Sequence, residues 1–189
     1  IEGQICVDSA PAMDKLWAAK SGIGWQGKHT NIISREYGSW IFLGELILNI
    51  ELDFNQPIED FCGTCTACIE ACPTNAIIQP YVLDARKCIS YLTIEYWDKP
   101  IPKEFNDKLD NWIFGCDICQ DVCPWNRFEE PTDEKRFEPR PGNVTADLEE
   151  IISLTPEQYA ERFRRSAIKR TKITGLKRNA AALREKGES

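Results

Sequence analysis

The cysteines constrain this chain more than any other feature of its sequence. Eight of the nine fall between Cys62 and Cys123, in short and regular spacings. The first run, CGTCTACIEACP at residues 62–73, has the spacing CxxCxxCxxxCP. Two-residue gaps wrap a short loop around one metal cube, while the longer gap and the proline send the fourth thiolate elsewhere. This spacing is typical of bacterial ferredoxins that hold two 4Fe-4S clusters.

A second run, CDICQDVCP at residues 116–124, supplies CxxCxxxCP and lacks a leading cysteine, which Cys88 can provide. Eight thiolates then suffice for two cubes. We therefore predict one cluster on Cys62, Cys65, Cys68 and Cys123, and a second on Cys72, Cys88, Cys116 and Cys119. The alternative is a structural four-cysteine zinc site with spare thiols, although zinc sites usually use two CxxC pairs a dozen or more residues apart.

The remaining composition narrows the class of protein. A secreted disulfide scaffold would usually be shorter, with an even number of dispersed cysteines. The leftover Cys6 is interpreted as a small buried thiol. The longest apolar run, at 40–50, is too short for a membrane span and is interrupted by Gly44 and Glu45. With no signal segment at the start, we expect a cytoplasmic protein that does not engage a membrane.

Charge is distributed unevenly along the chain. The formal net charge of −7 argues against a wholly basic nucleic-acid binder. Residues 129–150 are rich in acids, whereas residues 162–178 contain lysines and arginines and no acid. Such a basic segment suits phosphate contacts, and its alternative is a solvated helix surface.

Hydrophobic patterning and capping residues predict an α+β fold. Pro11 suits the first turn of a helix, and Thr155-Pro156-Glu157 is a good cap and first turn. The elements we expect are a helix over 12–20, a buried strand over 41–52, a helix over 84–96 that carries Cys88, a helix over 103–112, a helix beginning at 155, and a basic helix over 169–186.

Several long motifs resemble those of epoxyqueuosine reductase. They are VDSAP at 7–11, KSGIGWQGKHT at 20–30, GSWIFLGELIL at 38–48, CISYLTIEYW at 88–97, WIFGCDICQDVCPWN at 112–126, and IKRTKITGLKRNAA from residue 168. The resemblance implies an oxidoreductase that converts epoxyqueuosine to queuosine at the wobble position of tRNA. It implies two 4Fe-4S clusters and cobalamin as cofactors, with electrons from an external donor passing through the clusters to cobalamin. It also supports the exchange of Cys72 and Cys123 between the two cubes.

The resemblance further implies roles for individual residues. Asp8 becomes the proton donor beside the cobalt and the substrate, although the same residue could cap the helix that begins near Pro11. Candidate cobalamin contacts are Asp8, Ser90, Gly115, Cys116 and Asp117, and polar groups beside clusters can instead hydrogen-bond the sulfurs. His29, the only histidine, could be a surface residue or a neighbour of a cofactor.

The same resemblance organises the chain into parts. Residues 1–61 would be part of a catalytic, cobalamin-binding α/β domain, residues 62–126 a two-cluster ferredoxin-like domain, residues 127–154 an acidic connector, and residues 155–189 the start of a helical, HEAT-like repeat tail. The family has a segment before VDSAP that shapes the cobalamin pocket, so we expect this chain to be a fragment that lacks it. We expect a monomer.

The predicted substrate is tRNA that carries epoxyqueuosine, held through phosphate contacts of Lys169, Arg170 and Lys172. The target base would be splayed from its stack; Trp25, Trp97 and Trp125 are possible stacking partners or core residues. Two other functions stay open. One is a two-cluster ferredoxin-type electron carrier, and the other is a cobalamin-dependent reductive dehalogenase.

Overall fold

The computed structural model describes residues 1–8, 10–97 and 99–187. The chain divides into two compact units, each of which is described by itself. The first comprises Ile1–Ala71, Ile77–Leu83 and Ile118–Pro131. The second comprises Cys72–Ala76, Asp84–Asp117 and Thr132–Ser189. Both helices and strands are present, so the predicted mixed class is confirmed at that level.

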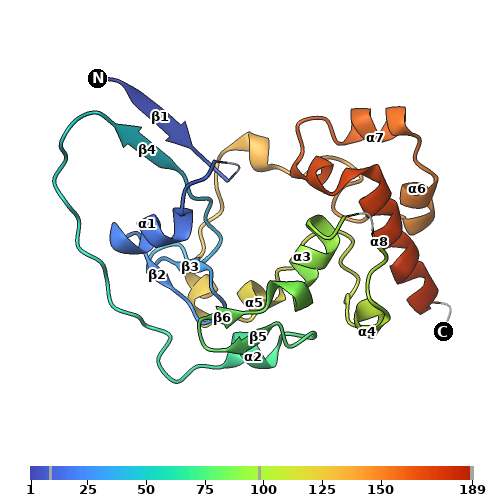
Figure 1. Ribbon diagram of the computed structural model, residues 1–189, viewed down its shortest axis with the longest axis horizontal. Coiled ribbons are helices and arrows are strands. Elements are labelled where there is room, and N and C mark those ends of the chain that lie inside the picture. The colour runs from blue at the N-terminus through green and yellow to red at the C-terminus, as the bar shows by residue number, and fades with distance from the viewer. Residues whose placement is uncertain (9, 98, 188–189) are drawn as a thin grey trace. The chain divides into compact units, whose positions relative to one another are not determined.

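Three antiparallel two-stranded ribbons form the strands of the first unit (Figure 1). In one ribbon, Gly3 lies opposite Leu48 and Cys6 opposite Glu45. The pairs are β1 (Gly3–Cys6) with β4 (Glu45–Leu48), β2 (Trp25–Gln26) with β3 (Ile32–Ile33), and β5 (Ile77–Gln79) with β6 (Val82–Leu83).

The expected buried strand over 41–52 is wrong in length and in burial. Only β4 is a strand, and Leu46 and Ile47 within it are 59% and 57% exposed. Aliphatic residues indicate burial only where a second layer covers them, and in the described part β4 pairs with β1 alone. Cys6, by contrast, is a buried thiol, as predicted.

The first helix, α1 (Asp14–Lys20), lies within the segment predicted for it and contacts β2 and β3. Its N-cap position is occupied by Met13. Asp8 is therefore not the capping residue of this helix, and that interpretation of the VDSAP motif is wrong.

Short helices lie within or directly after the cysteine runs: α2 (Ala67–Glu70), α5 (Ile118–Asp121) and the 3-10 helix η2 (Pro124–Phe128). The α2 and α5 helices contact each other. Beside them the Trp25 ring meets Phe61 and Trp125 edge-on, at centroid distances of 5.2 and 4.9 Å. Trp25 is 3% exposed, which confirms it as a core residue.

The second unit is helical. It contains the 3-10 helices η1 (Ala85–Lys87), η3 (Lys135–Phe137) and η4 (Ala167–Thr171), and the α-helices α3 (Ile89–Ile94), α4 (Lys103–Asn106), α6 (Leu148–Ser153), α7 (Pro156–Arg162) and α8 (Lys172–Gly187). The α7 helix begins with a capping box formed by Thr155 and Gln158, which confirms the predicted start.

Two helix predictions are corrected in this unit. The segment 84–96 is not continuous, because Cys88 adopts an extended conformation between η1 and α3. The helix predicted over 103–112 ends at Asn106, and Asp110 and Asn111 have φ values of +47° and +67° that a right-handed helix does not allow.

The α8 helix organises the core of the second unit. Leu183 packs into one hydrophobic cluster with Leu92 and Phe105, while Leu176 and Ala180 pack into another with Phe163. Spacings of three and four residues place these side chains along one helix face. The helix begins at Lys172, three residues later than predicted, because residues 167–171 form η4. Among the described residues, no helix combines the length and apolarity that crossing a membrane requires.

Candidate iron-sulfur centre

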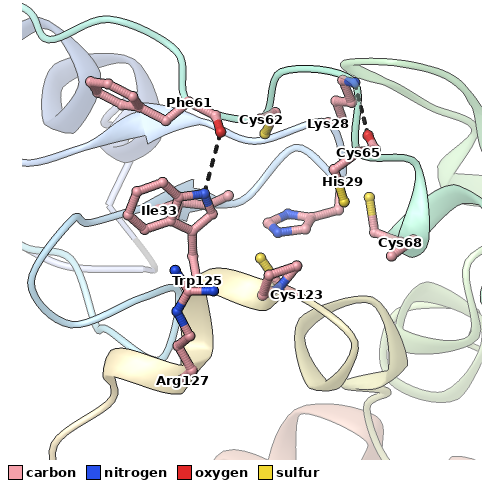
Figure 2. A pocket seen from close by; sticks show the side chains of 12 residues that line it. Lys28, His29, Ile33, Phe61, Cys62, Cys65, Cys68, Cys123, Trp125 and Arg127 are labelled. Atoms are coloured by element: carbon pink, nitrogen blue, oxygen red, sulfur yellow. Dashed lines mark hydrogen bonds between the residues drawn. The ribbon is translucent and has the colours of Figure 1, made fainter.

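Four predicted ligands of the first cluster surround one cavity of the first unit. The cavity has a volume of about 220 Å³ and is lined by the thiols of Cys62, Cys65, Cys68 and Cys123. In Figure 2 their sulfur atoms approach the same space from the loop 62–65, from α2 and from the start of η2. Cysteines that are far apart in the sequence thus meet here, in the grouping that the spacing predicts.

Backbone turns and a buried lysine hold the loop 62–65. The amide of Cys65 donates to the carbonyl of Cys62 at 3.1 Å. Lys28 is 8% exposed, and its ammonium donates to the carbonyls of Gly63 at 2.6 Å and Cys65 at 2.8 Å. The buried cation therefore stabilises the loop and places positive charge beside the cavity, where thiolates would be negative. The sequence did not predict this role, because there Lys28 is only part of the motif KSGIGWQGKHT.

The four thiols influence one another electrostatically. Burial, together with negative charge on Cys62, Cys123 and Cys65, raises the pKa of Cys68 to about 11. Burial also raises the pKa of Cys62 and of Cys123. Thiolates are the form that binds metal. Four thiolates this close together repel one another, so all four ionise only when they bind a positively charged group.

The cavity has room for a group larger than a water molecule, and its thiol lining suits a cluster. It is several times the roughly 30 Å³ that one water molecule occupies in the liquid. In the part of the chain that is described, no three His, Cys, Asp or Glu side chains are close enough together to ligate a single metal ion. In addition, the indole of Trp25 donates to the sulfur of Cys62 at 3.4 Å, the kind of hydrogen bond that surrounds cluster ligands.

A buried amide anchors the segment that contains Cys123. Asn126, 8% exposed, accepts from the Ser39 amide at 2.6 Å and donates to the Gln120 carbonyl at 2.7 Å. Gly38 has φ +67°, and a Cβ there would lie 2.2 Å from the Asn126 oxygen. The close approach of the backbone at Gly38 to Asn126 therefore requires glycine. This contact joins the GSW motif to the Trp-Asn pair at 125–126, shortly after the last cysteine.

His29 also lies at the cavity. It is 4% exposed and its ring lies among the sulfurs in Figure 2. Burial, with a contribution from Lys15, lowers the pKa of His29 to about 4, so the imidazole is neutral at ordinary pH. Of the two positions left open for His29, the structure selects the one beside the candidate centre.

The other four predicted ligands are described by their local surroundings. The sulfur of Cys72 accepts from the Ala76 amide at 3.3 Å. Cys88 lies between η1 and α3, and Cys116 packs against the hydrophobic side chains of the core around Leu92. These three belong to the second unit, whereas Cys119 lies on α5 of the first.

A buried polar network supports the segments of Cys88 and Cys116. The Thr93 hydroxyl, fully buried, donates to the Ile89 carbonyl at 2.7 Å and accepts from the Gly115 amide at 3.0 Å. Asn179 of α8 donates to the carbonyls of Thr93 and Ile113, both at 2.8 Å. The network links α8 to the segment that follows Cys88 and to the segment that precedes Cys116, and no sequence pattern pointed to it.

The proposed cobalamin contacts divide between the units. Asp8 is exposed, belongs to the first unit and has φ +28°, a backbone conformation rare for a non-glycine residue. Ser90, Gly115, Cys116 and Asp117 belong to the second unit. A Cβ on Gly115 would meet no atom within 4 Å, so the backbone there is open on that side.

The basic segment 162–178 is not a uniform solvent-exposed surface. Arg178 donates to the carbonyls of Leu92 at 2.8 Å and Lys99 at 2.9 Å, where it caps the end of α3. Arg170 pairs with Glu95 at 2.5 Å. The ammonium of Lys172 lies 4.9 Å from the centre of the Trp97 ring, and Trp97 is 41% exposed rather than part of a core. Lys169, Arg170 and Lys172 are all exposed.

Comparison with known proteins agrees with this chemistry. Residues 61–126 match the family model of the 4Fe-4S double cluster binding domain. The matched range contains the eight clustered cysteines and excludes Cys6. All four thiols of the cavity fall within this range, which is similar to iron-sulfur domains of the double-cluster class.

The relatives narrow that class. Epoxyqueuosine reductase of Cellulophaga algicola is 53% identical over 95% of this chain. A crystal structure of epoxyqueuosine reductase with an epoxyqueuosine-modified tRNA stem loop superposes with a TM-score of 0.93 at 34% identity over 98% of the chain. A Bacillus subtilis epoxyqueuosine reductase, with its catalytic aspartate loop swung out of the active site, superposes at 0.90 with 33% identity over 98% of the chain. Over nearly all of its length the chain is a relative of the epoxyqueuosine reductases, and the resemblance found in the sequence is confirmed.

The relatives are longer proteins. The chain spans 58% of the Cellulophaga algicola protein and 49% of each of these two solved chains.

Proposed function

We propose that the protein carrying this chain reduces epoxyqueuosine to queuosine in the wobble position of tRNA. The observation that carries the proposal is the convergence of Cys62, Cys65, Cys68 and Cys123 on one cavity within a chain related to epoxyqueuosine reductases. The solved relative that holds an epoxyqueuosine-modified tRNA stem loop supports the substrate. Neither the electron-carrier nor the dehalogenase alternative accounts for that relative.

Two 4Fe-4S clusters are part of this proposal, one on the four converging thiols and one on Cys72, Cys88, Cys116 and Cys119. The clusters, when bound, supply one-electron transfer from an external donor. The chain supplies the thiolates, the Lys28 cation and the Trp25 donor that hold the first set in place. Eight cysteines used as cluster ligands rather than in disulfides suit a reducing compartment, and we propose the cytoplasm.

Cobalamin is the third proposed cofactor. It supplies low-valent cobalt that reacts with the substrate when bound. Ser90, Gly115, Cys116 and Asp117 are the proposed contacts in the second unit, and the open side of Gly115 supports a close approach there. The proposed domains follow the same assignment: 1–61 as part of the cobalamin domain, 62–126 for the clusters, 127–154 as connector and 155–189 as the start of a HEAT-like tail. We further propose that the protein acts as a monomer.

Asp8 is the proposed proton donor. Removing an epoxide oxygen requires a proton at that oxygen, which a carboxylic acid in a loop can deliver. The Bacillus subtilis relative has a catalytic loop that is named for an aspartate, which supports this role for the exposed Asp8. In the proposed reaction, two electrons from the external donor and two protons remove the epoxide oxygen as water, and the Asp8 carboxyl supplies one of these protons and becomes a carboxylate.

The exposed Lys169, Arg170 and Lys172 are the proposed tRNA contacts. Their charges would neutralise phosphates, so affinity for tRNA falls as salt rises. The ion pair of Arg170 with Glu95 orients that guanidinium and leaves it 47% exposed. Replacing Lys169 by Gln is expected to weaken tRNA binding uniformly across sequences and to reduce the salt slope by about 1.

The proposal is tested on the full-length protein prepared without air. We expect about eight irons per chain, four for each of two clusters, with acid-labile sulfide and about one cobalt. The Cys68→Ala variant is expected to lose about half of the iron. One zinc and no sulfide would overturn the cluster assignment. Turnover of epoxyqueuosine-containing tRNA tests the reaction itself, and halide release from an organohalide in its place would support the dehalogenase alternative.

The Asp8→Ala variant tests the proton donor. We expect it to keep iron and cobalt and to lose turnover by about a hundredfold to ten-thousandfold, the usual contribution of a general acid. Asp53→Ala, at an exposed carboxylate of the same unit, is the control and should react at the parental rate. An Asp8→Ala enzyme with parental activity would contradict the role.

A further inference from the structure

The imidazole of His29 lines the thiol-lined cavity, and the proposed function does not explain why it is there. The ring reaches the cavity from the turn between β2 and β3, where the Gly27 amide donates to the Asn31 carbonyl at 2.8 Å. It is 4% exposed and lines the same space as Cys62, Cys65, Cys68 and Cys123 (Figure 2). Its Nε2 atom is buried and has no hydrogen-bond partner among the described residues.

The opposite nitrogen determines which tautomer is present. Nδ1 of His29 accepts the Asn31 amide hydrogen at 3.1 Å. A nitrogen that accepts carries a lone pair, so in the neutral ring the proton must be on Nε2. The Nε2–H group is therefore a donor. It is buried beside the cavity that the four cysteines line, and no acceptor for it is found among the described residues.

Neighbouring contacts hold the ring in this orientation. The Lys15 ammonium donates to the side-chain oxygen of Asn31 at 2.9 Å, which ties down the residue that binds Nδ1. A Cβ at Gly27 would lie 3.0 Å from Cε1 of His29 and 2.5 Å from Cδ1 of Ile33. The glycine thus provides the room that the ring occupies, and a ring turned over would place its Cδ2–H group against the Asn31 amide and leave that amide without its acceptor.

The same geometry argues against His29 as a metal ligand. A ligand nitrogen must present a lone pair, which would move the proton to Nδ1 and against the Asn31 amide. Four thiols already meet the ligand number of one cube. A donor role leaves every one of these groups satisfied.

We propose that His29 donates its Nε2–H to a sulfur of the iron-sulfur cluster held by the four converging thiols, and that this bond raises the reduction potential of that cluster. The inference rests on the proposed cluster at this cavity. Reduction adds negative charge to the cluster and its sulfurs, and a hydrogen bond to sulfur stabilises the reduced form more than the oxidised form. Lys28, whose buried ammonium holds the loop 62–65, acts in the same direction.

The test is a mediated potentiometric titration, followed by electron paramagnetic resonance, of the full-length protein with its clusters. His29→Phe keeps a ring and removes the donor. At a fixed potential, we expect the ratio of reduced to oxidised first cluster to fall about tenfold, which is roughly 59 mV for a one-electron couple. The second cluster should keep its potential. His29→Gln, which can still donate, should recover part of the shift.

A matched control changes the same cavity without changing a donor. Ile33 is 1% exposed and lines the cavity beside His29, so Ile33→Val alters packing alone. Its cluster should titrate as the parent does. A first cluster in His29→Phe that also titrates as the parent does would overturn the proposal.

A second measurement needs no substitution. With ¹⁵N-labelled histidine, pulsed electron paramagnetic resonance of the reduced protein should detect a weak nitrogen coupling from the hydrogen-bonded ring. Absence of that coupling, with iron and sulfide at full content, would refute the role of His29 and leave the cluster intact. Absence of iron and sulfide would instead refute the proposed cluster itself.

Discussion

Replacement of Asn179 by leucine tests how the second unit holds two of the predicted cluster ligands. Asn179 is fully buried on α8, where it donates to the carbonyls of Thr93 and Ile113 and accepts from the Arg178 guanidinium at 2.7 Å. Leucine has the same branched heavy-atom skeleton and no polar atoms. The substitution therefore removes the hydrogen bonds and places two somewhat larger methyl groups in the same positions.

The expected loss follows from the groups left without a partner. Each buried carbonyl that loses its donor costs about 1–3 kcal/mol, and the guanidinium loses one of its acceptors. Because the carbonyls keep a second lone pair and leucine adds apolar contact, we take the low end and expect about 3 kcal/mol in total. That is a large part of the roughly 5–15 kcal/mol by which a domain is stable.

Hydrogen exchange measured by mass spectrometry reports the loss of stability segment by segment. A change of about 3 kcal/mol corresponds to roughly a hundredfold faster exchange for amides that open with the network. We expect it in α3, in α8 and at Gly115, whose amide donates to Thr93. The control is Thr174→Leu, at an exposed position of the same helix, where we expect a change within about 0.5 kcal/mol.

If Asn179→Leu exchanged at the rate of the control, the buried network would not be what joins α8 to α3. Apolar packing of Leu176, Ala180 and Leu183 would then account for the docking of this helix.

Three further substitutions test other contacts. Gly38→Ala places a Cβ against Asn126 at a φ of +67°, so we expect a loss of about 1–3 kcal/mol and a thermal midpoint lower by several degrees; an unchanged midpoint would contradict the required glycine. Thr155→Ala removes the capping box of α7 and should cost about 1 kcal/mol in urea unfolding, while Thr155→Ser should cost almost nothing. Lys28→Met leaves two carbonyls of the loop 62–65 without a donor, so iron should be lost to a chelator several-fold faster; equal rates would show that the ammonium does not hold the loop.

Local sequence was sufficient wherever the physical cause is itself local. The spacing of the cysteines grouped Cys62, Cys65 and Cys68 because two intervening residues reach around one space. Thr155 was identified as a cap because its side chain bonds the backbone only three residues away. The α1 helix was anticipated within two residues of its start for the same kind of reason.

Prediction failed where a residue's environment comes from elsewhere in the chain. The aliphatic residues around Leu46 and Ile47 were expected to be buried, yet their burial depends on what covers the ribbon. The basic residues of 162–178 were taken together because they are adjacent in sequence. Folding instead directs Arg178 into carbonyls near the end of α3 and pairs Arg170 with Glu95, since their partners are brought close only by helix packing.

The number, type and spacing of the sulfur ligands can be taken directly from the amino-acid sequence. They were enough to predict the class of cofactor, and the motifs around them were enough to find the resemblance to a family. Which nitrogen of His29 faces the sulfurs, and that Lys28, Trp25 and Asn126 support them, depends on distances between residues up to 87 positions apart. Hydrogen bonds act over about 3 Å, and no spacing rule along a chain predicts such a separation between remote segments.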